Sequence, residues 1–250
     1  MKVVILAGGF GTRISEESHL KPKPMVEIGD KPILWHIMKE YSHYGFNEFI
    51  ICLGYKGGEI KRFFSDYYLY QSDVTINLQT DEYTYHRSTS EPWKVTLAVT
   101  GGRIKRVKEY IGNETFLLTY GDGVSDVNIA DTVRFHRQHG KLLTMTTVNV
   151  ASRFGVIKPD KNGLIKSFRE KADSDGSLIN AGYMVCEPEV LDYISGDDTI
   201  FEKEPLETLA KEGQLMAYRH DGFWKCMDTM RDKEQLEALW CTGRAEWKTW

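Results

Sequence analysis

The chain begins with a short apolar run that ends in closely spaced glycines. Residues 2–6 are rich in β-branched side chains and lead into Leu6-Ala7-Gly8-Gly9-Phe10-Gly11-Thr12-Arg13. An uninterrupted apolar run is typical of a strand that is buried on both faces, as in a parallel sheet. Glycines at its end let backbone N–H groups approach phosphate oxygens, because no Cβ stands in the way. The sequence therefore predicts a buried strand followed by a loop suited to phosphate.

The segments after this loop alternate between helical and strand patterns. Helices are predicted at residues 32–44, 58–67, 103–110 and 128–139, and strands at 49–53, 115–120 and 142–150. Such alternation favours an α/β fold of the Rossmann-like kind, with a mixed, mostly parallel central sheet flanked by helices. Ligands in such folds bind at the carboxyl ends of the strands.

From about residue 151 the pattern changes to short strand-like pieces broken by Asp, Asn, Gly and Ser. The pieces lie at 154–157, 164–168 and 179–186, and helices are predicted to return at 188–194, 205–212 and 231–240. We expect these strands to form a small antiparallel annex that covers the sheet. No linker or internal repeat divides the chain, so residues 1–250 are expected to form a single domain.

Charge and hydropathy exclude two classes of partner. The formal net charge of -4 over 250 residues gives no basic surface for nucleic acid. No apolar run approaches the roughly 20 residues that cross a bilayer, and the start is too short for a signal peptide. A cytoplasmic protein without a membrane partner is therefore expected. The four cysteines are far apart, which favours free thiols over a metal site.

The glycine loop matches neither of two common nucleotide motifs. It lacks the Gly-Lys-Ser/Thr that closes a P-loop, and Ile14 stands where the dinucleotide fingerprint has its third glycine. Alone, the glycines are as compatible with a tight turn as with a phosphate loop. Arg13 and Lys23, the latter within Lys21-Pro22-Lys23-Pro24, add two cations, and these favour phosphate.

Two acidic residues are candidates for binding a divalent cation. Asp122 lies between Gly121 and Gly123, directly after the apolar run at 115–120. Mg²⁺ prefers one or two carboxylates together with substrate phosphates. Asp228 is the acid we would pair with it, but Asp122 is also compatible with a simple turn and Asp228 with the cap of the next helix.

Together these motifs resemble the sugar nucleotidylyltransferase family. The shared features run through nearly the whole chain in the family's order: the glycine loop, Lys-Pro-Lys-Pro-Met, Gly-Asp-Gly, Glu170-Lys171, Asn180-Ala181-Gly182 and Met227-Asp228-Thr229. Residues 26–38, Glu91-Pro92-Trp93 and Trp247-Lys248-Thr249-Trp250 are similar to the members that use CTP and glucose 1-phosphate. The resemblance implies in-line attack on the α-phosphorus, assisted by Mg²⁺, to give CDP-glucose and pyrophosphate. The product would be an activated sugar for deoxysugar or O-antigen polysaccharide synthesis.

The resemblance also implies roles for individual residues. The nucleotide would be bound by Leu6, Ala7, Gly8, Gly9, Phe10, Gly11, Thr12, Arg13, Lys23, Arg103 and Gly121. Arg13 and Lys23 would be catalytic, and Asp122 and Asp228 would hold the metal. The sugar phosphate would be bound by Glu170, Lys171, Asn180 and Gly182. Residues 1–150 would thus form mainly the nucleotide-binding half, and residues 151–250 mainly the sugar-binding half.

Two departures from the family pattern and two alternative functions stand beside this interpretation. Ala172 replaces a frequent proline, and the segment 97–103 is several residues shorter and lacks a polar residue that contacts the nucleotide.

The base is not visible in any side-chain spacing, so an enzyme that uses UTP or dTTP is one alternative. A non-catalytic regulator that binds nucleotide sugars is the other. The aromatic cluster at residues 63–70 leads us to expect a homo-oligomer.

Overall fold

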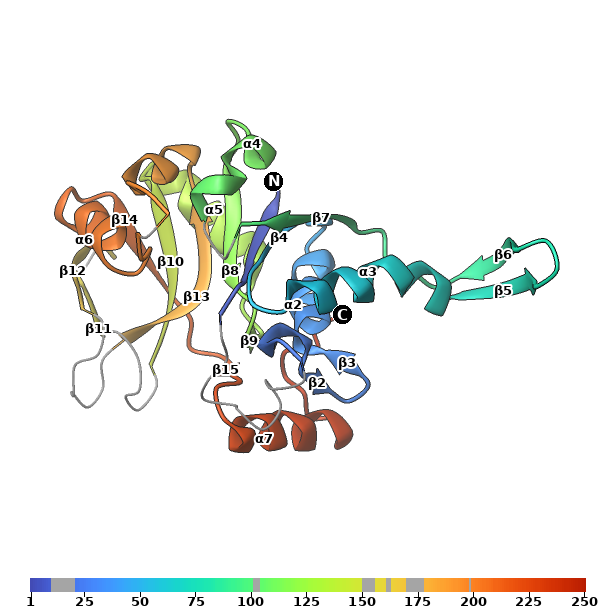
Figure 1. Cartoon of the computed structure of the whole chain (residues 1–250). Helices are drawn as coiled ribbons and strands as arrows, with labels where there is room; N and C mark the ends of the chain where they lie inside the picture. The colour runs from blue at the N-terminus through green and yellow to red at the C-terminus, as the bar shows by residue number, and fades with distance from the viewer. Residues whose placement is uncertain (10–20, 101–103, 150–155, 161–162, 170–177, 198) are drawn as a thin grey trace.

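A nine-stranded mixed sheet forms the centre of the molecule (Figure 1). The computed structural model describes residues 1–250 except 10–20, 101–103, 150–155, 161–162, 170–177 and 198. Four neighbouring strands run parallel, in the order β8 (Phe116–Tyr120), β1 (Val3–Ala7), β4 (Glu48–Leu53) and β7 (Lys94–Val99). Three of these strands were predicted from their apolar runs, whereas β7 was not.

The long strand β13 (Leu178–Cys186) joins the two halves of the sheet. It runs antiparallel to β8 on one side. On the other side it pairs with β10 (Leu143–Asn149), whereas β11 (Val156–Pro159) pairs with Leu178 and Ile179 on the edge opposite to β10. Two strands complete the sheet, β12 (Ile165–Arg169) beside β11 and β14 (Leu215–Arg219) parallel to β10. The α/β class with a mixed central sheet is confirmed, but the antiparallel strands extend this sheet at its edge instead of covering it.

Helices pack on both faces of the sheet, over two hydrophobic cores (Figure 1). One face carries α2 (Ile33–His43), α3 (Gly57–Tyr70) and α5 (Ile129–His139), while α7 (Met230–Cys241) packs against the same core beyond the ends of the strands. The other face carries η3 (Ile104–Val107), α4 (Lys108–Ile111), η4 (Pro188–Tyr193) and α6 (Glu204–Lys211). Strand β1 contributes side chains to both cores, because Val3 and Ile5 point to one and Val4 points to the other. No helix in the described ranges is both long and apolar enough to span a bilayer.

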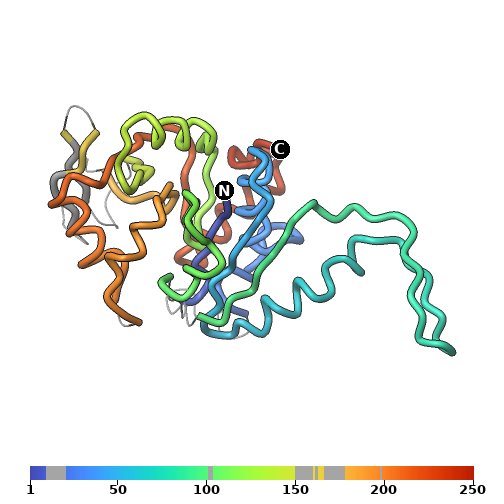
Figure 2. The backbone as a smooth tube through the Cα atoms, turned by 90° about the horizontal axis from the view of Figure 1, so that it is seen from above, coloured from blue at the N-terminus to red at the C-terminus, as the bar shows by residue number. Residues whose placement is uncertain are grey.

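Short elements lie outside the main sheet. Near the carboxyl end of β1 are the 3-10 turn η2 (Lys23–Met25) and the pair β2 (Glu27–Ile28) and β3 (Lys31–Pro32). A second pair joins β9 (Gly123–Ser125) to β15 (Trp224–Cys226). A third pair, β5 (Ser72–Asn77) and β6 (Glu82–Ser88), projects from the end of α3 as an arm in both views (Figures 1 and 2). None of these pairs was predicted from the sequence.

Candidate active site

Glycines follow three adjacent parallel strands at their carboxyl ends. Gly8 follows β1, Gly121 follows β8 and Gly54 follows β4. The N–H of Gly121 donates to the Leu6 carbonyl at 3.0 Å, which extends the pairing of β1 and β8 beyond the strands. A Cβ on Gly54 would lie 2.5 Å from the Gly8 Cα, so only glycine fits there. Gly54 was missed by the sequence analysis, although it ends a predicted strand in the same way as Gly8.

Lys23, Asp122 and Asp228 meet beside these strand ends. The Lys23 Nζ lies 2.6 Å from Oδ2 of Asp122 and 2.5 Å from Oδ1 of Asp228. The residues are 99 and 205 positions from Lys23 in sequence, so the fold alone brings them together. The three side chains are partly buried, at 13%, 32% and 18% exposure for Lys23, Asp122 and Asp228. Such shielding strengthens the charge interactions compared with those at an open surface.

The β9–β15 pair sets the two carboxylates side by side. Cys226 pairs with Gly123, so Asp122 immediately precedes one strand and Asp228 is the second residue after the other. The Met227 N–H donates to the Asp122 carbonyl at 2.8 Å and fixes the junction. Asp228 does not cap the following helix: Thr229 is the N-cap of α7, and it forms a capping box with Asp232. The capping alternative for Asp228 is therefore wrong.

The ammonium group of Lys23 is held in its charged form. Burial lowers the pKa of Lys23, but the charges of Asp122 and Asp228 and their hydrogen bonds outweigh burial, so its pKa lies above 10.5. A lysine that stays protonated supplies a fixed positive charge, not a general base. Lys23 itself is therefore suited to the binding of anions and not to proton abstraction.

The donor set also fits a hard divalent cation. Two carboxylates converge on one cation position, which the Lys23 ammonium fills here at 2.5 and 2.6 Å. Mg²⁺ typically takes one or two carboxylates plus substrate phosphates and water. The described residues contain no group of three or more His, Cys, Asp or Glu side chains placed to hold a metal. The pair thus fits a cation that arrives with a phosphate ligand better than one resident in a protein cage.

Strand β13 places the two described sugar-site candidates next to β8. The Asn180 Oδ1 accepts the Gly182 N–H at 2.8 Å, which holds a local turn in the strand. Gly182 has φ +83° and packs on the Tyr120 ring, where a Cβ would lie 2.6 Å from Cδ2. The Tyr120 hydroxyl donates to Glu202 at 2.6 Å. The sequence analysis did not identify Tyr120 or Glu202 as part of this wall.

Seven of the predicted site residues lie outside the described residues. They are Phe10, Gly11, Thr12 and Arg13 of the glycine loop, Arg103, and the pair Glu170 and Lys171. The other predicted residues are described: Leu6 and Ala7 in β1, Gly8 and Gly9 after it, Lys23, Gly121, Asp122, Asn180, Gly182 and Asp228. Of these described residues, Lys23, Asp122 and Asp228 are joined by ion pairs between their side chains, and Asn180 contacts the Gly182 backbone.

Comparison with known sequences shows that the whole chain is similar to nucleotidyl transferases. The model of the nucleotidyl transferase family matches residues 2–236. A glucose-1-phosphate cytidylyltransferase of Salmonella typhimurium is 54% identical over 257 aligned positions, which cover 100% of both chains. A probable glucose-1-phosphate cytidylyltransferase of Bacillus subtilis is 46% identical, with the same full coverage.

Comparison with solved structures shows the same fold. The crystal structure of HddC from Yersinia pseudotuberculosis superposes with a TM-score of 0.74 over 96% of this chain and 99% of its own, at 24% identity. A UDP-glucose pyrophosphorylase complexed with UDP-glucose gives a TM-score of 0.73 over 97% of this chain and 99% of its own, at 19% identity. At these identities the structures support the fold alone.

Proposed function

This chain belongs to the nucleotidyl transferase family, and on that premise we propose that it makes CDP-glucose and pyrophosphate from CTP and α-D-glucose 1-phosphate. The observation that carries the proposal is the Lys23–Asp122–Asp228 cluster at the carboxyl ends of β1 and β8. The choice of CTP and glucose is supported by the 54% and 46% full-length identity to the cytidylyltransferases.

The reaction is a displacement between two anions. An oxygen of the sugar phosphate attacks the α-phosphorus in line, and pyrophosphate leaves. The attacking oxygen is already ionised at neutral pH, so no general base is needed. The protein must align the two phosphates and offset their charge, which is where most catalysis of phosphoryl transfer arises. Lys23, which stays protonated, is not such a base, and this agrees with that requirement.

Lys23 would have two partners during the cycle. In the free protein its ammonium forms ion pairs with Asp122 and Asp228. When the triphosphate enters, the ammonium would turn to the reacting phosphates, whose negative charge would again favour its protonated form. The carboxylates would then hold Mg²⁺ with oxygens of the triphosphate, and the ion would supply positive charge to the reacting phosphates. The backbone beyond β1, with Arg13, would hold the rest of the triphosphate.

The sugar side would be built on β13 and the segment before it. Asn180 and Gly182 sit on the strand next to β8, one strand away from the glycine loop. We propose that they bind the hexose, together with Glu170, while Lys171 binds its phosphate. The chain would thus act as one domain, with residues 1–150 mainly holding the nucleotide and 151–250 mainly the sugar.

A substrate panel tests the proposal directly. Each of CTP, UTP, dTTP and GTP is combined with glucose, galactose and mannose 1-phosphates, and pyrophosphate release is measured with and without Mg²⁺. We expect CTP with glucose 1-phosphate to give the highest kcat/KM by at least about a hundredfold, since polar contacts to a base discriminate strongly. A preference for UTP or dTTP would make the chain another member of the family. Binding of CDP-glucose without turnover of any pair would indicate the regulator instead.

Two broader expectations remain proposals. The product would supply deoxysugar or O-antigen polysaccharide synthesis, a role that rests on the identity of the product alone. Self-association into a homo-oligomer is supported by aromatic side chains at the end of α3, where Tyr68 is 51% and Tyr70 79% exposed. The neighbouring Phe63 and Phe64 instead pack against the core.

A further inference from the structure

Glu40 is a buried acidic residue that the proposed chemistry does not use. It lies on α2 and is 3% exposed, and its neighbours Ile37, Met38 and Tyr41 on this helix belong to the hydrophobic core. Burial of a carboxyl group in such surroundings is costly unless its oxygens are hydrogen-bonded. Both oxygens of Glu40 have partners, and these lead to the strand that follows Asp122.

Strand β9 begins directly after Asp122, and one of its two edges pairs with β15. The Asp122 carbonyl and the Asp126 N–H both bond to residues that flank β15, so the backbone groups of even-numbered residues face that strand. Successive residues of a strand direct their backbone groups to opposite edges, so the Gly123 carbonyl and the Ser125 N–H face away from β15. Among the described strands, β15 is the only one that pairs with β9. Since Gly123 and Ser125 are buried, their backbone groups need other partners.

The side chains of Glu40 and Tyr183 supply these partners at the second edge of β9. Oε1 of Glu40 accepts the Ser125 N–H at 3.2 Å, and Oε2 lies 2.6 Å from the Tyr183 hydroxyl oxygen. The Tyr183 hydroxyl donates to the Gly123 carbonyl at 3.1 Å. Two side chains thus bind the donor and the acceptor that a neighbouring strand would bind.

Burial supports a complete chain of hydrogen bonds along this edge. It raises the pKa of Glu40 well above 4.5, although the hydrogen bonds from Tyr183 and Ser125 act in the opposite direction. The neutral carboxyl is therefore favoured, and its O–H can donate to the Tyr183 oxygen. The Tyr183 proton is then left for the Gly123 carbonyl, so each group in the chain has a partner.

Both side chains stand on well-packed elements. Tyr183 is 2% exposed, it pairs with Thr119 of β8 through its backbone, and its ring stacks on that of Tyr41 at 6.0 Å between centroids. Glu40 follows from the middle of α2. Because Gly123 adjoins Asp122, the place where these contacts hold β9 also sets the place of the Asp122 carboxylate. A metal ligand must be held to within about 0.5 Å by the groups that support it.

We propose that Glu40 is a positioning residue for the divalent cation, and that it acts on Asp122 through the backbone of β9. Together with Tyr183 it holds β9 where the Asp122 carboxylate can share a cation with Asp228. This inference rests on the proposed function, in which the two carboxylates hold Mg²⁺.

Mn²⁺ binding to the full chain, followed by electron paramagnetic resonance without substrates, tests the inference. Glu40→Met keeps most of the side-chain volume and removes both contacts. We expect it to bind Mn²⁺ about tenfold more weakly, at the low end of the effect of losing a group that orients a metal ligand. Glu40→Gln keeps an oxygen for the Ser125 N–H and gains an amide N–H for the Tyr183 oxygen, so it should bind Mn²⁺ like the wild type. Tyr183→Phe removes only the contact with Gly123 and should weaken binding several-fold.

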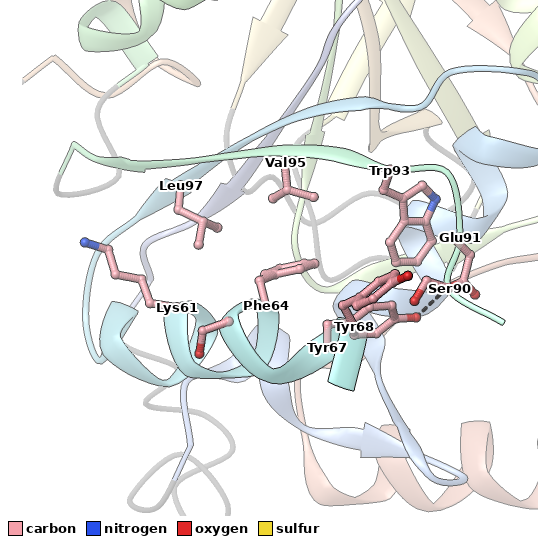
Figure 3. A pocket seen from close by; sticks show the side chains of 10 residues that line it. Lys61, Phe64, Tyr67, Tyr68, Ser90, Glu91, Trp93, Val95 and Leu97 are labelled. Carbon is pink, nitrogen blue, oxygen red and sulfur yellow. Dashed lines mark hydrogen bonds between the residues drawn. The ribbon is translucent and has the colours of Figure 1, made fainter. Parts of the chain in front are cut away.

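Tyr67→Phe is the control for the loss of a hydroxyl group with two partners. The Tyr67 hydroxyl accepts the Trp35 Nε1–H at 2.8 Å and donates to Glu91 at 2.5 Å. Figure 3 shows Tyr67 and Glu91 in the wall of a pocket of about 470 Å³ between α3 and β7. The partners of Tyr67 thus lie on α2 and before β7, not on β9. Tyr67→Phe should lower the midpoint of urea unfolding, as Tyr183→Phe does, but should leave Mn²⁺ binding unchanged.

The results separate the inference from the proposed function. Wild-type Mn²⁺ affinity in folded Glu40→Met and Tyr183→Phe would overturn the positioning role. So would a loss in Glu40→Gln as large as that in Glu40→Met, or a loss in Tyr67→Phe equal to that in Tyr183→Phe. A wild type that binds Mn²⁺ but releases no pyrophosphate from any substrate pair would overturn the proposed function alone. A wild type that binds Mn²⁺ neither alone nor with CTP would overturn both.

Discussion

Replacement of Lys23 by methionine should separate two effects of its positive charge, which supports turnover but competes with a metal ion for Asp122 and Asp228. Methionine keeps most of the side-chain volume and removes the charge that lies 2.6 Å from Asp122 and 2.5 Å from Asp228. The transition state then lacks one well-placed cation, and loss of a single such group costs about 10²–10³ in kcat, or about 3–4 kcal/mol. We therefore expect turnover to fall by that factor.

The same substitution should strengthen metal binding in the absence of substrate. In the wild type a divalent cation must displace the ammonium from the two carboxylates, whereas in Lys23→Met it meets them without a counter-ion. Mn²⁺ binding, followed by electron paramagnetic resonance, is expected to tighten about fivefold or more, because the removed opposing charge counts for at least about 1 kcal/mol in a partly buried site. Activity and metal affinity thus change in opposite directions.

Lys21→Met is the matched control. Lys21 lies in the same Lys-Pro-Lys-Pro motif, but it pairs with Glu27 at the surface, at 46% and 48% exposure. Exposed pairs contribute little, so turnover and Mn²⁺ affinity should remain near the wild type. Near-normal pyrophosphate release by folded Lys23→Met would refute a catalytic role for Lys23. Weaker Mn²⁺ binding would refute the competition between ammonium and metal.

Two further predictions concern stability. Burial lowers the pKa of His36 to about 4, so the folded protein holds it neutral while the unfolded chain binds a proton near pH 6.5. The free energy of unfolding should therefore be highest above pH 6.5 and fall by about 3 kcal/mol as the pH drops to 4. In urea unfolding at several pH values, His36→Gln should lack this fall. His43→Gln, which changes an exposed histidine, should keep it. Thr229→Ala removes the N-cap whose Oγ1 accepts the Asp232 N–H at 3.2 Å, and should cost about 1 kcal/mol, or a melting temperature lower by about 2–4 °C in calorimetry. An unchanged melting temperature would show that the cap does not hold the start of α7.

The parts of the fold that could be predicted are those where burial leaves a periodic signal. Val3 to Ala7 is an apolar run because both faces of β1 are covered, and α2 keeps Ile33, Leu34, Ile37 and Met38 on one buried face. The β5–β6 arm does carry a pattern of period two, since Val74, Ile76, Tyr83 and Tyr85 alternate with polar residues, but our sequence analysis did not interpret these short runs as strands. Strands β9 and β15 have three residues each, too few for any period.

The candidate site was predictable only in part. Asp122 stands out locally, because it lies between glycines at the end of an apolar strand. Its pairing with Asp228 depends on the β9–β15 register, which no local pattern encodes, and only the order of family motifs suggested it. Gly54 and Tyr120 were missed because their importance lies in contacts with Gly8 and Gly182, distant in sequence.

The position of the two carboxylates in the chain has a consequence for synthesis on the ribosome. Asp122 belongs to the first half, but its partner Asp228 reaches it only through β15, which follows almost all of the sheet. A nascent chain can therefore build β1, β4 and β8 and cover them with helices while the cation pair is still missing. Truncated products that end before residue 224 would lack Asp228, and Lys23 would then have Asp122 as its remaining partner in this cluster. The cell thus obtains a working charge cluster only from chains translated nearly to completion.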